Sequence, residues 1–113
     1  MRNMIDDTIG KIETKIQGTG SIKAENKVEL LNLLDTLRSE ISELAKTHAE
    51  QAQSIKGFTE LSAHEATRSD RNPQLLKLSI DGLTASVDGF EATHPRLVQI
   101  VNSICTALSN LGI

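Results

Sequence analysis

Apolar residues recur along this chain at alternating intervals of three and four, which is the period of one face of an α-helix. The first run predicts a short helix over residues 4–17, which ends at the glycine-rich break Gly18-Thr19-Gly20. The apolar face of this helix consists of Ile5, Ile9, Ile12 and Ile16.

A second and much longer run predicts one continuous helix over residues 24–69. Its repeat follows a heptad seam over about four heptads, with two polar members. Gly57 lies inside this run and lowers helix stability by about 1 kcal/mol relative to alanine, which weakens the helix without ending it. The seam is Leu30, Leu34, Leu37, Ile41, Leu44, His48, Gln51, Ile55 and Phe58.

The segment 68–73 interrupts the pattern and separates the long helix from the rest of the chain. Asn72 is a favourable N-cap and Pro73 a favourable first helical residue, so a helix over residues 73–92 follows. The apolar repeat then passes Pro95 without losing its phase and continues over a last helix, 95–111. Proline removes a backbone hydrogen bond, so Pro95 predicts a kink, or a new helix capped near Thr93 or His94.

Folding the chain about residue 71 brings the two long apolar seams together. The outgoing helix is about 65 Å long and the return arm about 60 Å, so the two arms match. The predicted fold class is all-α: a long antiparallel, coiled-coil-like helical hairpin, kinked at Pro95, in a single domain over residues 1–113. The short first helix packs on one end, against residues 30–44 and 97–111, and His48 lies level with His94.

The other end of this hairpin has only two helices, which cannot enclose a core, so it requires a partner. A second copy of the chain supplies one through a two-fold symmetric four-helix arrangement. The residues predicted to form this dimer or partner contact are Ile55, Phe58, Leu76, Ile80 and Leu83.

Composition and charge narrow the function classes. The chain has no Trp, no Tyr and only two Phe, so its core is predicted to be aliphatic. The net charge of −3 and the absence of a basic tract argue against nucleic-acid binding. Residues 97–113 carry no charge but are shorter than the ~20 residues of a membrane span. Two acids precede the first apolar run, so no signal peptide is predicted and a cytoplasmic location is expected.

Glu91, Ala92, Thr93 and His94 form an E-x-x-H spacing, which on a helix places a carboxylate and an imidazole on one side. Di-metal helical bundles use two such motifs, and a dimer would supply two, with His48 added from the facing arm. The preferred interpretation is a structural polar layer of His48 and His94 that fixes the register of the hairpin. A metal site of Glu91, His94 and His48 is the alternative. No catalytic motif and no cofactor are predicted.

The single cysteine, Cys105, excludes an internal disulfide and a multi-cysteine metal site. It lies in an uncharged stretch, without a neighbouring His or Lys to favour the thiolate, and is predicted to be an inert buried thiol. Glu60 and His64 form an i,i+4 pair, for which a solvated helix face is the preferred interpretation over a metal site.

The C-terminal residues Phe90-Glu91, His94-Pro95, Leu97 and Ala107 to Ile113 resemble the pattern F-E-x-x-H-P-x-L and A-L-x-N-x-G-I. This pattern is similar to that of a family of small bacterial proteins known only as a domain of unknown function. The resemblance implies a bacterial, cytoplasmic, all-helical protein and brings no activity, ligand or catalytic residue. The segment 48–73 is longer in this chain than in the family pattern. If it is an insertion, the tip of the hairpin is a feature that other members of the family do not share.

These observations favour a non-enzymatic helical module for protein–protein interaction or scaffolding that forms a homodimer. The first alternative is the metal-binding helical bundle just described. A further alternative is a subunit of a larger complex, with the uncharged C-terminal helix as its docking element.

Overall fold

The computed structural model describes residues 7–111, which form five α-helices and no strand. The predicted all-α class is therefore confirmed for these residues. Residues 4–6 of the first predicted helix, with Ile5, lie outside the described part, as do Gly112 and Ile113 of the C-terminal pattern. The helices are α1 (Thr8–Gly18), α2 (Ala24–Ala45), α3 (Ala49–Thr67), α4 (Pro73–Ser86) and α5 (Pro95–Leu111).

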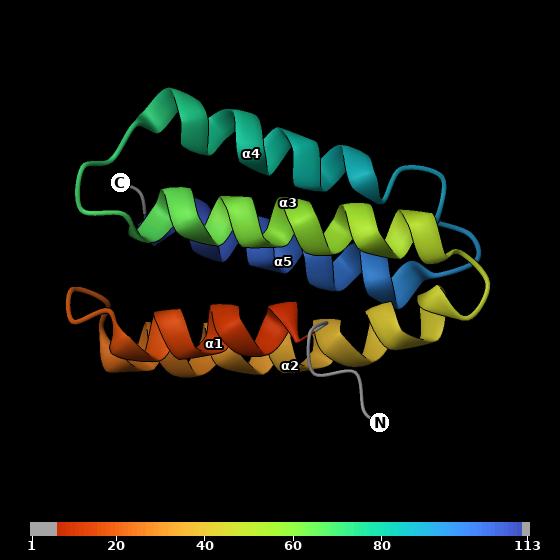
Figure 1. Ribbon diagram of the computed structural model, residues 1–113, viewed down its shortest axis with the longest axis horizontal. Helices are drawn as coiled ribbons and strands as arrows, with labels where there is room; N and C mark the ends of the chain where they lie inside the picture. The colour runs from red at the N-terminus through yellow and green to blue at the C-terminus, as the bar shows by residue number, and fades with distance from the viewer. Residues whose placement is uncertain (1–6, 112–113) are drawn as a thin grey trace.

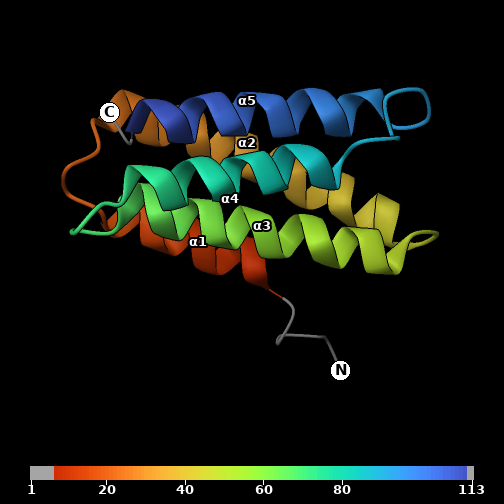
Figure 2. The ribbon, with the colours of Figure 1, turned by 90° about the horizontal axis from the view of Figure 1, so that it is seen from above.

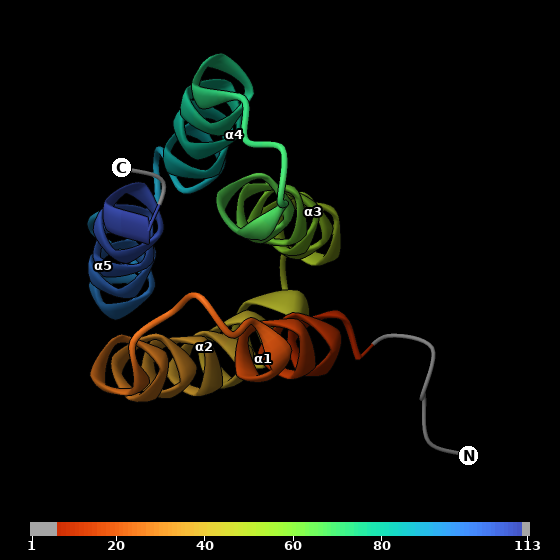
Figure 3. The ribbon, with the colours of Figure 1, turned by 90° about the vertical axis from the view of Figure 1, so that its left-hand side faces the viewer.

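Successive helices run in opposite directions, so the chain forms an up-and-down bundle (Figure 1). Seen end-on, α2, α3, α4 and α5 surround the core, and α1 lies beside α2 and beneath α3 (Figure 3). The view from above places α4 between α3 and α5 (Figure 2). The longest dimension of the molecule is 38 Å, which excludes a hairpin of about 65 Å.

The predicted continuous helix over 24–69 is wrong, because the chain turns at Lys46, Thr47 and His48. The backbone of His48 (φ −135°, ψ 64°) lies outside the helical region. Its amide donates to the Leu44 carbonyl at 2.8 Å, and the Thr47 hydroxyl lies 2.8 Å from His48 Nδ1. These local contacts satisfy polar groups at the end of α2 and favour a turn over further helix.

The return arm breaks at the same level. Helix α4 ends at Ser86 instead of residue 92, and Gly89 adopts φ 95°, a left-handed conformation that favours glycine. Pro95 is the first residue of α5, so of the two predicted outcomes the new helix is confirmed and the kink is wrong. Each arm of the predicted hairpin thus bends back at its midpoint. Helix α2 packs against α5, α3 packs against α4, and the α2–α5 pair packs against the α3–α4 pair.

Because the hairpin arms bend at their midpoints, the first helix packs at a different place from the one predicted. Ile9, Ile12 and Ile16 are buried as one face of α1, but this face contacts α2 and α3 instead of α2 and residues 97–111. Asp7 caps the helix by accepting a hydrogen bond from the Gly10 amide at 3.2 Å. Arg38 of α2 forms an ion pair of 2.7 Å with Glu13 of α1, which links the two helices.

The core is aliphatic, as the composition predicts, because no aromatic side chain is among its buried members in residues 7–111. Leu34 and Leu37 of α2 belong to the same cluster of buried residues as Val101 and Ile104 of α5, and the two helices pack together. Helix α3 lies in the middle of the molecule and contacts all four other helices. Small buried residues on α3 allow this close packing. They are Ala52, Thr59, Ser62, Ala63 and Ala66.

Gly57 of α3 and Gly82 of α4 predict opposite effects of substitution. A Cβ at Gly57 meets nothing within 4 Å, so Gly57→Ala should stabilise the protein by about 1 kcal/mol through helix propensity. A Cβ at Gly82 overlaps the Phe58 ring, so Gly82→Ala should bring no gain. Urea denaturation of both variants tests this, and equal stabilisation by the two would contradict the packing of Phe58 on Gly82.

Candidate interaction face

The structure encloses most of the residues predicted to contact a partner. Ile55 and Leu83 are fully buried at 0% exposure, and Leu76 is buried at 8%. Ile80 is partly buried against the same core. The predicted partner contacts at these four residues are wrong. Because the α3–α4 half folds onto the α2–α5 half, their side chains belong to the core of the single chain. Phe58 alone among the five remains substantially exposed, at 37%.

A different set of apolar side chains is exposed on α3 and α4. Phe58 is joined by three leucines whose exposures are 44% for Leu61, 41% for Leu75 and 59% for Leu78. Phe58 and Leu61 are three residues apart on α3, and Leu75 and Leu78 are three apart on α4, so each pair shares one helix face. We call the four residues Phe58, Leu61, Leu75 and Leu78 the apolar strip.

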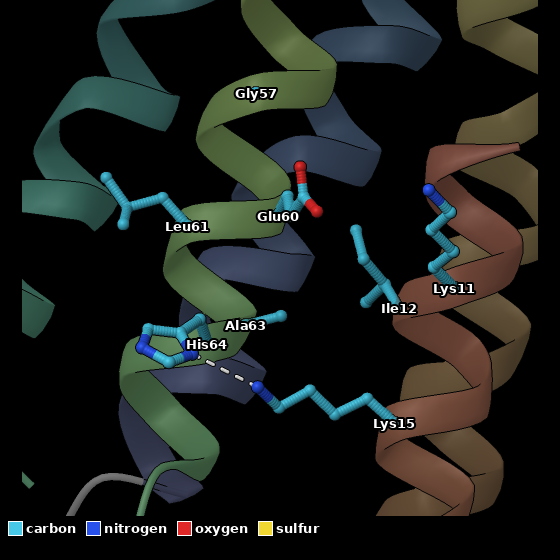
Figure 4. Close-up of a pocket in the computed structure, with 8 residues that line it drawn as sticks. All are labelled: Lys11, Ile12, Lys15, Gly57, Glu60, Leu61, Ala63 and His64. Carbon is cyan, nitrogen blue, oxygen red and sulfur yellow. Dashed lines mark hydrogen bonds between the residues drawn. The ribbon is translucent and has the colours of Figure 1, made fainter. Parts of the chain in front are cut away.

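Close packing of α3 against α4 makes the apolar strip continuous. The Phe58 ring lies over Gly82 of α4, in the space that a side chain at residue 82 would occupy. In the close-up of Figure 4, Leu61 points from α3 towards α4. The strip therefore follows the outer seam between two antiparallel helices.

Charged residues of both signs lie close in sequence to the residues of the apolar strip, on α4 and at the end of α3. On α4, Lys77 and Asp81 form an ion pair of 3.0 Å, and both side chains are well exposed. At the end of α3, Arg68 lies 3.0 Å from Glu65, whose carboxylate is almost completely buried. An apolar centre with a charged rim is the usual anatomy of a protein–protein contact.

The two histidines of the predicted polar layer are brought together at the end of the bundle where the α2–α3 and α4–α5 connections meet (Figure 1). The ring centroids of His48 and His94 are 6.1 Å apart. Phe90 completes a cluster of three rings, 5.3 Å from His48 and 5.4 Å from His94, each pair edge-to-face. Both histidines are half-buried.

The two histidines have matching local environments. Each directly precedes a helix, His48 before α3 and His94 before α5. Each has a threonine before it whose hydroxyl lies close to the ring Nδ1, at 2.8 Å for Thr47 and 2.9 Å for Thr93. The rings therefore link two connections that are distant in sequence.

The helical E-x-x-H geometry expected for a metal site is wrong, because residues 91–94 lie in the connection between α4 and α5. The Glu91 carboxylate accepts a hydrogen bond of 2.9 Å from the Gly89 amide, which fixes it within the turn. Within residues 7–111, no three His, Cys, Asp or Glu side chains are grouped so as to hold a metal ion.

Cys105 lies on α5 with its thiol buried. Desolvation by burial raises the pKa of this thiol, and the Thr84 hydroxyl at 3.5 Å from Sγ opposes the increase. The neighbouring apolar residues of α5, Leu97, Val101 and Ile104, are buried inside the chain. The uncharged C-terminal helix is therefore a core helix, and its apolar face is not free to act as a docking element.

Sequence reasoning missed three of the four members of the apolar strip. The seam on α4 passes through Leu76, Ile80 and Leu83, and it faces the core. Leu75 and Leu78 lie outside that seam, and their off-phase position is the signal that a second apolar face exists. Leu61 is off-phase on α3 in the same way.

Over residues 7–111, the fold and the exposed strip define an all-α bundle with an apolar face open to solvent. Residues 30–113 match the model of the family described as Domain of unknown function (DUF4404), and the chain belongs to this family. No curated protein and no solved structure matches the chain. None of the helices in the described part combines the length and apolar character needed to cross a membrane.

Proposed function

We propose that the protein is a non-enzymatic helical interaction module that pairs with a second copy of itself through the apolar strip. The observation that carries this proposal is the concentration of four large exposed apolar side chains on one face of α3 and α4. Elsewhere in the described residues the only large hydrophobic side chain comparably exposed is Val28 on α2. Isolated exposed apolar residues are common on soluble proteins, whereas grouped ones indicate a contact surface.

The size of the face fits a dimer of modest affinity. Helix α3 has 19 residues and α4 has 14, so the longer side of the face is about 28 Å and two helix diameters make it about 20 Å wide. The resulting footprint of about 560 Å² per partner lies near the lower end for specific interfaces. About half of each strip residue remains to be covered, which contributes about 1 kcal/mol per side chain.

The rim favours a second copy as the partner. In a two-fold arrangement each residue of one chain meets a residue of the other reciprocally. Lys77 and Asp81 carry opposite charges on one side of the strip, so the ammonium of one copy can face the carboxylate of the other, twice per dimer. A rim whose charges all had the same sign would instead repel the same rim on a second copy of the chain.

Sedimentation velocity of the untagged protein over a range of concentrations tests the proposal. We expect monomer at low micromolar concentration and a growing fraction of dimer towards the millimolar range. A protein that stays monomeric throughout this range would contradict self-association. Ordered assembly beyond the dimer would contradict a closed two-fold contact.

A further inference from the structure

Helix α3 is the central helix of the bundle, and it contacts α1, α2, α4 and α5 (Figure 3). A helix in that position ordinarily presents large apolar side chains to its neighbours. Helix α2 follows this rule, since its five buried residues are all leucine or isoleucine. Helix α3 does not, because Ile55 is the one large apolar side chain among its buried residues. The others are Ala52, Lys56, Thr59, Ser62, Ala63, Glu65 and Ala66.

Two buried polar groups of α3 are paired within the helix or at its end. The Thr59 hydroxyl donates to the Ile55 carbonyl at 2.7 Å. The Glu65 carboxylate lies 3.0 Å from the guanidinium of Arg68, which directly follows the last helical residue. These contacts are kept when α3 moves as a unit, so they do not hold the helix against its neighbours.

Ser62 of α3 is 0% exposed, and its hydroxyl has no hydrogen-bond partner among the described residues. A buried hydroxyl without a partner has lost its hydrogen bonds to water, which favours any state in which it is hydrated. The other buried serine of the described part, Ser79 on α4, donates to the Leu76 carbonyl at 2.8 Å. Ser62 therefore favours the release of α3, whereas Ser79 does not favour the release of α4.

We propose that α3 undocks from the other helices as a unit in the native protein, and that this opening removes the apolar strip as a binding face. Undocking hydrates Ser62, while α2 and α5, which carry larger apolar side chains, stay packed together. Openings of a single structural unit occur at a lower free energy than global unfolding.

The apolar strip depends on a docked α3, because Phe58 and Leu61 lie on α3 whereas Leu75 and Leu78 lie on α4. When α3 undocks, the Phe58 ring leaves Gly82 and the strip is divided into two halves. A second copy that pairs through the strip binds only the docked state, so pairing stabilises that state. This coupling rests on the proposed function, whereas the opening of α3 does not.

Hydrogen exchange of the ¹⁵N-labelled full chain, followed by NMR at several urea concentrations below the unfolding transition, tests the opening. We expect the slowest amides of α3 to be protected at least about tenfold less than those of α2 and α5. Their protection should also depend less on urea, because opening one helix exposes less surface than global unfolding. Amides of α3 that match those of α2 and α5 in both respects would overturn the proposal.

Two serine variants connect the opening to the unpaired hydroxyl. Ser62→Ala removes this hydroxyl and should slow the exchange of the α3 amides about tenfold. Ser79→Ala is the matched control, because it removes a buried hydroxyl that is already paired, and it should bring no such protection. Equal protection by the two substitutions, or none from Ser62→Ala, would contradict Ser62 as a cause of the opening.

Exchange measured by mass spectrometry at micromolar and near-millimolar protein concentrations tests the coupling to the apolar strip. We expect exchange in α3 to slow at the higher concentration, as the dimer forms. A dimer detected by sedimentation without slower exchange in α3 would overturn the coupling alone. A protein that stays monomeric would contradict the proposed function together with the coupling, while fast exchange of α3 in that monomer would still confirm its opening.

Discussion

Replacing Leu83 by alanine should lower the free energy of unfolding by about 3 kcal/mol. Leu83 is 0% exposed, and its truncation removes buried methyl groups from a core that cannot fully collapse around the loss. Urea denaturation monitored by circular dichroism at two protein concentrations measures the effect. Because Leu83 is enclosed by its own chain, the loss should be the same at both concentrations.

A matched change on the surface completes this test. Leu78→Ala removes the same atoms from a side chain that is 59% exposed, and at low protein concentration it should cost well under 1 kcal/mol. A loss at residue 83 that grows on dilution would show that Leu83 stabilises a contact between chains. That result would restore the interpretation of this residue as a dimer contact.

The second large effect concerns association. Leu78→Lys places a charge in the middle of the apolar strip, so each half of a two-fold contact would have to bury an unpaired ammonium. We expect dimerisation to weaken by at least tenfold, measured by sedimentation velocity beside the wild-type protein.

Val28→Lys is the matched control for this change. Val28 on α2 is also 59% exposed but lies outside the apolar strip, so a lysine there adds the same charge to a different face. The control variant should associate as the wild type does. Equal weakening by both substitutions would attribute the effect to net charge and would remove the assignment of the interface to α3 and α4.

The apolar periodicity predicts the helices better than it predicts their connections. Asn72 and Pro73 mark the start of α4 by clear local chemistry, and the Asn72 side chain accepts hydrogen bonds from two amides of the first turn. The turn at residues 46–48 contains neither glycine nor proline, and the apolar phase continues across it. A short turn that preserves the phase cannot be distinguished from continuous helix by periodicity alone.

His48 and His94 lie close together because the structure keeps the antiparallel pairing of α3 with α4, which is part of the predicted hairpin. Helices α3 and α4 turn about residues 68–72, so residues at equal distance from that turn still meet at the far end of the pair. The long hairpin and the folded bundle share this relation. The sequence therefore predicts correctly that the two rings lie together, although the predicted helix over residues 24–69 is in fact two helices, α2 and α3.

The predicted dimer residues were misassigned for a related reason. A two-helix end needs a partner, and the sequence offered no signal that the other half of the same chain supplies it. Once α2 and α5 cover Ile55, Leu76 and Leu83, the exposed apolar surface moves to the off-phase residues of α3 and α4. The location of an interface thus depends on which apolar helix faces are already buried by packing within the chain.

The most direct test of the central proposal is a dilution series of the ¹⁵N-labelled wild-type protein, followed residue by residue in amide chemical shifts. We predict that the shifts that change between millimolar and low micromolar concentration fall on the outer faces of α3 and α4, around Phe58, Leu61, Leu75 and Leu78. Changes centred on α1, α2 or α5, or a spectrum that does not depend on concentration, would contradict an interaction module that pairs through the apolar strip.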